Sequence, residues 1–189
     1  IFIGRSGCGK GTQAALLQKK LEEKDPENKV FYLETGHEFR DFTSAEGYSN
    51  NLAKKIQEEG GLQPAFLSVW IWASIFIKNI DEKKHLIIDG SLRRLGEAII
   101  FSDAMRFYSR KPTIIYLNVT RKWSENRLGE RHRSDDVLAM VKRRLEGIYA
   151  ELMPAVQYFE TNLDVNFLDI NGENTIEDIH NDIVQKLGW

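Results

Sequence analysis

The residues of this chain best suited to chemistry lie near its start, in the glycine-rich segment GRSGCGKGT at residues 4–12. Gly4, Gly9 and Lys10 satisfy the spacing GxxxxGK, and an apolar run precedes them. A strand that ends at Gly4 and turns into a helix would point several backbone N–H groups at one spot, where the helix dipole adds positive potential. Glycines let an anion approach the backbone, and the lysine supplies a mobile charge. The pattern predicts a site for the phosphates of a nucleoside triphosphate.

One position of this loop departs from the general pattern. Gly11 stands where a Ser or Thr usually follows the lysine, and the hydroxyl comes one residue later, at Thr12. Cys8 allows two interpretations, a small filler residue or an oxidisable thiol near a helix N-terminus. The residues expected to contact the nucleotide are Gly7, Cys8, Gly9, Lys10, Gly11 and Thr12.

The elements that position this loop follow from the pattern of apolar residues. Short β-type runs occur at residues 1–3, 29–33, 85–88, 113–119 and 165–170. Helices are expected between them, at 10–23, 38–42, 50–59, 64–77 and after Ser134. The segment 64–77 carries no charge but is too short to span a bilayer, so we expect a buried helix with Trp70 and Trp72 in the core. The alternation predicts an α/β fold, a parallel sheet covered by helices on both faces.

Composition limits the class of protein. With 189 residues and 42% apolar content, a single globular domain is expected. The charges nearly balance, 26 Lys+Arg against 28 Asp+Glu, so a net charge of −2 indicates neither a nucleic acid nor an anionic membrane as partner. The only cysteine is Cys8, which excludes internal disulfides and favours a reducing compartment, the cytoplasm.

Arginines are the second chemical signal. Phosphoryl transfer between nucleotides brings several negative charges together, and the protein must neutralise them and keep out water. A doubly wound fold could gather arginines from four segments at one edge of the sheet. The candidates are Arg40, Arg93, Arg127, Arg131, Arg133 and Arg144. Helical periodicity after Ser134 places Arg144 on the flank of the apolar stripe, within reach of a cleft, and points Arg143 away.

These blocks together resemble the adenylate kinase family, in its short-lid type, from Gly4 to about Glu177. GKGTQ at 9–13 is one such block. ETGHEFR at 34–40 is similar to the family's threonine–glycine block, LIIDGSLRR at 86–94 to its DGFPR block, and residues 127–145 to its lid and following helix.

The resemblance implies a P-loop NTPase three-layer fold with five parallel strands, a small helical part that binds the nucleoside monophosphate (NMP) and a short lid. The implied parts of the single domain are a core at 1–33, 81–126 and 135–189, an NMP-binding part at 34–80 and a lid at 127–134. It also implies ATP as phosphoryl donor, Mg²⁺, an NMP as acceptor and a monomeric enzyme.

The resemblance implies roles residue by residue. Catalysis falls to Lys10, Arg93, Arg127, Arg133 and Arg144. Arg127 and Arg131 join the loop over the donor nucleotide. The acceptor is contacted by Thr35, Gly36, Arg40, Gln63, Arg93, Glu97, Arg133 and Arg144. Magnesium lies at Thr12 and, through water, at Asp89.

The chain departs from the family at three of these places. Ser91 and Leu92 replace the Phe and Pro of DGFPR, where the proline often follows a cis bond; a cis bond before Leu92 would cost roughly 3 kcal/mol more than trans, so we expect a rearranged backbone beside Arg93. His37 replaces the aspartate of the threonine–glycine block and is expected to be structural or solvent-facing. Glu97 replaces a glutamine that reads the acceptor base.

The last departure leaves the acceptor open. Glutamine can accept from the adenine amino group and donate to the neighbouring ring nitrogen, whereas a carboxylate only accepts. Guanine, with two adjacent donors, suits Glu97 better; alternatively, the loop shifts and leaves Glu97 exposed. We therefore expect an NMP kinase, ATP + AMP giving two ADP, with GMP or another NMP as the alternative acceptor. A nucleotide-binding protein without turnover remains a further alternative; a P-loop ATPase or GTPase acting on water is disfavoured by Gly11 and the arginines.

Overall fold

A five-stranded sheet lies at the centre of the computed structural model, which describes residues 1–130 and 138–189, with the side chains of 130, 138–144 and 146 left out. Its strands are β1 (Phe2–Gly4), β2 (Val30–Glu34), β3 (His85–Asp89), β4 (Thr113–Asn118) and β5 (Asn166–Asn171). The spatial order is β2-β3-β1-β4-β5, and every neighbouring pair is parallel. The predicted parallel sheet is confirmed, with strand ends shifted by about one residue.

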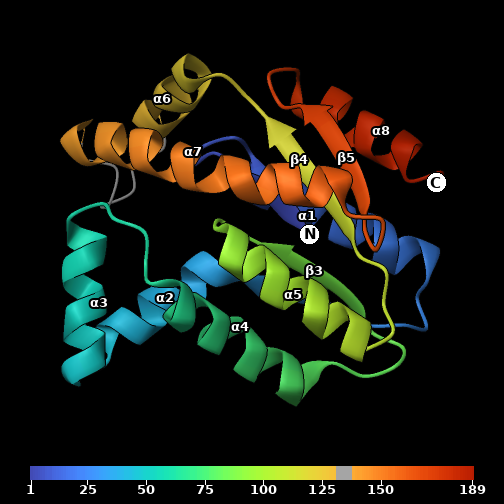
Figure 1. Cartoon of the computed structure of the whole chain (residues 1–189). Helices are drawn as coiled ribbons and strands as arrows, with labels where there is room; N and C mark the ends of the chain where they lie inside the picture. The colour runs from blue at the N-terminus through green and yellow to red at the C-terminus, as the bar shows by residue number, and fades with distance from the viewer. Residues whose placement is uncertain (131–137) are drawn as a thin grey trace.

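Helices cover both faces of this sheet (Figure 1). Successive strand residues point to opposite faces, so Phe2 and Ile3 belong to different apolar clusters. The cluster around Phe2 packs under α1 (Lys10–Lys24) and α8 (Ile176–Lys186). The cluster around Ile3 packs under α4 (Ala65–Asn79), α5 (Leu95–Phe107) and α7 (Leu138–Thr161). The three-layer α/β architecture predicted from the sequence is therefore present.

The remaining helices lie at one end of the layers. They are α2 (Thr35–Ser44), α3 (Tyr48–Glu58) and α6 (Arg121–Glu130). α2 packs against both α3 and α4, and α6 packs against α7 (Figure 1). α2 is longer than predicted because it begins directly where β2 ends. None of the described helices has the length and apolar character needed to cross a membrane.

The predicted burial of α4 is half right. Trp72 is 1% exposed and packs with Phe76 and Phe101. Trp70 is 54% exposed and meets the ring of Phe42 edge-on, so its assignment to the core was wrong. The helix is apolar around its whole circumference, and composition alone therefore could not show which face is buried.

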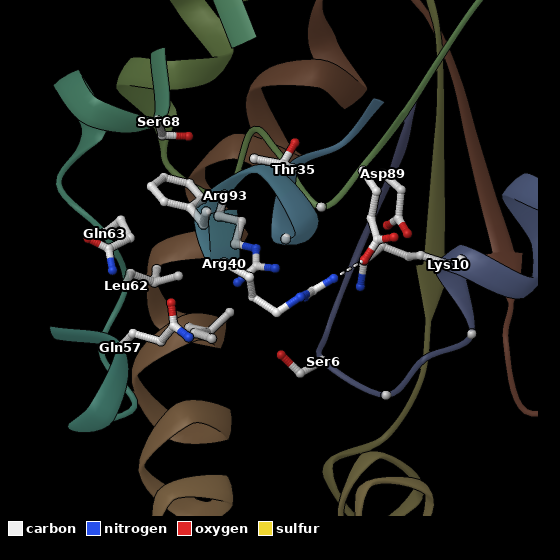
Figure 2. A pocket seen from close by; sticks show the side chains of 18 of the residues that line it. Ser6, Lys10, Thr35, Arg40, Gln57, Leu62, Gln63, Ser68, Asp89 and Arg93 are labelled. Atoms are coloured by element: carbon white, nitrogen blue, oxygen red, sulfur yellow. Dashed lines mark hydrogen bonds and ion pairs between the residues drawn. The ribbon is translucent and has the colours of Figure 1, made fainter. Parts of the chain in front are cut away.

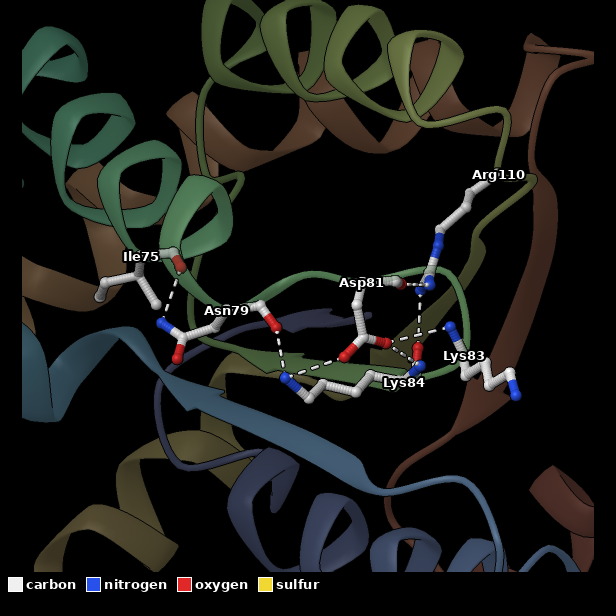
Figure 3. Close-up of polar contacts among 6 residues, drawn as sticks. All are labelled: Ile75, Asn79, Asp81, Lys83, Lys84 and Arg110. Carbon is white, nitrogen blue, oxygen red and sulfur yellow. Dashed lines mark hydrogen bonds and ion pairs between the residues drawn. The ribbon is translucent and has the colours of Figure 1, made fainter.

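The turn between α4 and β3 fixes the beginning of β3 (Figure 3). The Asp81 carboxylate accepts hydrogen bonds from the backbone N–H groups of Lys83 (3.0 Å) and Lys84 (2.8 Å) and pairs with the Lys84 ammonium (3.1 Å). Arg110 donates to the carbonyls of Asp81 (2.6 Å) and Lys84 (2.8 Å). The backbone hydrogen bond from Lys84 is the main reason why the pKa of Asp81 is lowered. These contacts anchor β3, whose other end carries Asp89.

Candidate active site

The order in which strands are added to the sheet reverses at β1. β2 and β3 lie on one side of β1, and β4 and β5 on the other. In such open parallel sheets, ligands bind at the carboxyl ends of the strands where the order reverses. A cavity of about 860 Å³ lies there. It brings together these predicted site residues: Gly7, Gly9, Lys10, Gly11, Thr12, Thr35, Gly36, Arg40, Gln63, Asp89, Arg93, Glu97 and Arg127.

The side chains in this cavity come from opposite sides. Figure 2 shows Arg40 and Arg93 in the middle, Lys10 and Asp89 on the side of the glycine-rich loop, and Gln57 and Gln63 on the side of α3 and the segment after it. Cationic groups from the glycine-rich loop, from α2 and from the segment after β3 therefore share one cavity.

The glycine-rich loop has the predicted strand–loop–helix form. Gly4 ends β1 at φ 147°, and a Cβ there would lie 2.7 Å from the Leu117 carbonyl oxygen, so only glycine fits. α1 begins at Lys10, whose ammonium donates to the carbonyls of Gly4 (3.2 Å) and Arg5 (2.9 Å). Cys8 is 2% exposed and packs in the cluster under α1 and α8. Its side chain is therefore a filler, and only its backbone could meet a ligand.

Gly11 lies beside Asp89, which explains the missing Ser or Thr. A Cβ at Gly11 would lie 3.3 Å from Oδ2 of Asp89, tighter than most Cβ contacts. The Asp89 carboxyl is buried, so it has little room to withdraw. The departure from the general loop pattern thus keeps space for a carboxylate at the end of β3.

Replacing Gly11 by serine is expected to push the Asp89 carboxylate aside and lower turnover by about tenfold, because small displacements of positioning groups are costly. We would measure kcat at varied Mg²⁺ concentration, together with thermal stability. Gly147→Ser is the control, since a Cβ at Gly147 meets nothing within 4 Å. Unchanged turnover in Gly11→Ser would contradict this account of Gly11.

Asp89 is an ionisable group held between opposing influences. Burial raises its pKa, while Lys10 and Arg93 act in the other direction and Glu34 raises it again. The Tyr32 hydroxyl donates to Oδ2 at 3.5 Å. A carboxylate beside two cations, with the Thr12 hydroxyl lining the same cavity, supplies the hard oxygen donors that Mg²⁺ prefers. Mg²⁺ usually takes only one or two protein ligands and completes its shell with water and phosphate, so these residues fit it.

The segment after β3 adopts the rearranged backbone that the sequence predicts. The described residues contain no cis peptide bond, and Leu92 instead has φ 61°, a left-handed conformation that costs about 1–3 kcal/mol. The Leu92 side chain is fully buried in the core, which offsets this strain. Ser91 hydrogen-bonds Thr35 through their two hydroxyls and so ties the segment to the start of α2. Because Ser91 and Leu92 are held in this way, the residue that follows them, Arg93, lines the cavity.

Acidic groups accompany the cations at the end of the cavity formed by β2, α2 and α5. Arg40 pairs with Glu34 at 2.8 Å, and both line the cavity. Glu97 is 3% exposed, which excludes the alternative that it is a surface residue. Burial raises the pKa of Glu97, opposed by hydrogen bonds from Ser68 and the Arg93 backbone. His37 is exposed and faces Asp41 at 3.5 Å, in agreement with the solvent-facing expectation.

The arginines of the predicted lid are only partly placed. Arg127 lines the cavity from α6, with its guanidinium 5.8 Å from the centre of the Trp123 ring. Arg131 and Arg133 lie outside the described residues. Arg144 belongs to α7, but its side chain is not among those described.

Sequence reasoning missed several residues of the cavity. They are Ser6, Tyr32, Glu34, Phe39, Gln57, Gly61, Leu62, Ser68, Gly90 and Ile148. Glu34 could have been found, because it ends β2 as Asp89 ends β3, and the two are register partners. Ser68 had no signal, because it lies in an apolar helix that resembled a purely structural one.

The parallel sheet with a glycine–lysine loop at its switch point defines an enzyme of the P-loop class. Comparison with known proteins narrows this further. The chain belongs to the adenylate kinase family, because the model of that family, described as "Adenylate kinase", matches residues 2–163. It is therefore a nucleoside monophosphate kinase, and members of this family use ATP with Mg²⁺ as phosphoryl donor.

Individual relatives differ in their names and lengths. The chain is 30% identical to adenylate kinase of Prochlorococcus marinus over 191 residues, covering 99% of this chain and 97% of that protein. It is 29% identical to human adenylate kinase isoenzyme 5 over 182 residues, 94% of this chain but only 30% of that longer protein. Uridylate kinase of Saccharomyces cerevisiae is 27% identical over 190 residues, covering 97% of this chain and 87% of that protein.

Proposed function

We propose that this kinase transfers the γ-phosphoryl group of ATP to a purine nucleoside monophosphate. The acceptor that we favour is AMP, so that ATP and AMP are both converted to ADP. The supporting observation is the meeting of Lys10, Arg93 and Arg40 in one cavity between the glycine-rich loop and α2–α4. Two of the three relatives cited above are named adenylate kinases, which supports AMP as the acceptor.

Each described residue has a role in this proposal. Lys10 and the backbone N–H groups of the loop bind the donor phosphates. Arg40 binds the acceptor phosphate, and Arg93 lies between the two and stabilises charge on the transferred group. Bound Mg²⁺ would neutralise phosphate charge, with Asp89 and Thr12 orienting its shell.

The predicted lid supplies the remaining roles. We propose that residues 127–134 close over the donor and exclude water, with Arg127 and Arg131 on its nucleotide. Arg133 and Arg144 would contact the transferred phosphate. We also propose that residues 34–80 bind the NMP and that the enzyme is a monomer, on the resemblance. The single cysteine and the near-zero net charge favour a cytoplasmic location.

GMP is the second candidate acceptor. Glu97 lies buried at the acceptor end of the cavity, in the place where the family carries a base-reading glutamine. A carboxylate accepts hydrogen bonds but does not donate them, and guanine offers two adjacent donors. The uridylate kinase among the relatives is a further reason to test every common monophosphate.

A coupled assay with AMP, GMP, CMP and UMP tests the proposal. We expect ATP consumption that depends on an added purine monophosphate and requires Mg²⁺. Saturable ATP binding without turnover would indicate a binding protein instead. ATP hydrolysis at the same rate without any acceptor would indicate a nucleotide hydrolase.

A further inference from the structure

The acceptor end of the cavity is rich in hydrogen-bond acceptors. Oε2 of Glu97 accepts from the Ser68 hydroxyl at 3.1 Å and from the backbone N–H of Arg93 at 3.3 Å. Ser68 belongs to α4 and Glu97 to the first turn of α5, and both line the cavity. The Ser68 proton is thus directed at Glu97, which turns the lone pairs of that hydroxyl towards other partners.

Gln63 adds another acceptor. Its Nε2 donates to the carbonyl of Ala53 at 2.8 Å. A carbonyl only accepts, so this contact fixes which end of the amide is nitrogen. Oε1 of Gln63 is then a buried acceptor with no hydrogen-bond partner among the described residues. The backbone of Gln63 is held in turn, because Arg94 donates to its carbonyl oxygen and pairs with Glu151 at 3.0 Å.

The two purines meet this arrangement differently. The pairing edge of guanine carries a ring N–H beside an amino group, two donors that a carboxylate can accept together. Adenine carries an amino donor beside a ring nitrogen that only accepts. Facing an ionised Glu97, that ring nitrogen would oppose an acceptor, and one of the two amide N–H groups of Gln63 is already donated to Ala53. A protonated carboxyl, in contrast, both donates and accepts, as the family's glutamine does.

We propose that Glu97 selects the acceptor base by its charge state, taking GMP when ionised and AMP when it carries a proton. The inference rests on the proposed function and deepens it. It makes Glu97 the residue that determines specificity, and it makes the preference between the two purines depend on pH.

The surroundings of Glu97 act on its protonation in both directions. Burial raises its pKa, while Ser68, Arg93 and Arg94 stabilise the ionised form. Among the described residues, the charged groups that act electrostatically on the Glu97 carboxyl are Arg93 and Arg94, which both precede α5. Ser68 of α4 is polar and uncharged. A raised pKa means that the carboxyl is protonated below it and ionised above it, so low pH favours AMP and high pH favours GMP.

The test is the ratio of kcat/KM for GMP to kcat/KM for AMP, measured on the same protein from about pH 4.5, near the ordinary pKa of a glutamate, to about pH 8.5. Titration of Asp89, of the magnesium complex and of the acceptor phosphate affects both substrates alike and cancels in the ratio. We expect the ratio to rise by at least about tenfold across this range, since discrimination through a mismatched buried polar contact is large.

Glu97→Gln is the decisive variant. It keeps the shape of the side chain and its acceptor oxygen for Ser68, but it does not titrate. We expect a ratio that favours AMP and stays constant with pH. Glu125→Gln is the matched control, since Glu125 is paired with Arg121 on α6, outside the cavity lining, and it should retain the wild-type profile.

Each outcome has one meaning. A pH-independent ratio in the wild type, or an unchanged pH dependence in Glu97→Gln, overturns the inference about Glu97 while leaving the kinase proposal intact. Absence of turnover with all four monophosphates overturns the proposed function itself. Should Glu97→Gln fail to fold, by circular dichroism, the wild-type ratio still decides.

Discussion

Replacing Lys10 by alanine is expected to lower turnover by at least about a hundredfold while leaving the fold intact. Lys10 is the mobile cation of the glycine-rich loop, and its ammonium lies against the carbonyls of Gly4 and Arg5, beside the cavity. Removing one preorganised charge that faces developing negative charge typically costs a factor of 100 to 1,000, about 2.7–4 kcal/mol. Alanine is the best helix former, so the start of α1 should persist.

The measurement is kcat with saturating ATP, Mg²⁺ and acceptor, together with circular dichroism and the thermal midpoint. Lys19→Ala is the matched control, because Lys19 is an exposed residue of the same helix and loses the same charge outside the cavity. We expect wild-type turnover for Lys19→Ala. If Lys10→Ala retained more than about a tenth of wild-type turnover, the role given to Lys10 would be wrong.

The framework of the site could be predicted because its signals are local. The glycine–lysine spacing requires a strand before it and a helix after it, and both are present around Gly4 and Lys10. Apolar strand runs identify the central sheet, because parallel strands are buried on both faces. Once the order of strands is doubly wound, the carboxyl ends of β1, β2 and β3 must meet, which brings Thr35 and Asp89 together.

Other parts of the site depend on contacts between distant segments and leave no local pattern. Nothing near Ser91 in the sequence shows that its hydroxyl meets Thr35, 56 residues away. Leu92 adopts a positive φ that leucine rarely takes, and the core contacts that hold it there come from other elements. The burial of Glu97 follows from the packing of α5 against α4, so the sequence left its exposed alternative open.

Arg93→Ala is expected to lower turnover by at least about a hundredfold, with a smaller change in KM. Arg93 enters the cavity between Lys10 and the acceptor end, and its charge acts on both Asp89 and Glu97. A guanidinium between two phosphates interacts most strongly when charge spreads over the transferred group, that is, in the transition state. Loss of such an interaction reduces kcat more than it weakens substrate binding. Steady-state kinetics with varied acceptor separate the two parameters.

Arg106→Ala controls for the loss of an arginine, since Arg106 is exposed and pairs with Asp103 (3.2 Å) and Asp164 (3.5 Å) on the surface. We expect it to behave as wild type in both kcat and KM. The backbone N–H of Arg93 still donates to Glu97 in Arg93→Ala, so the acceptor end keeps its hydrogen bond and only the guanidinium is removed. A rise in KM with unchanged kcat would make Arg93 a substrate-binding residue and not a transition-state one, because uniform binding leaves kcat unaffected.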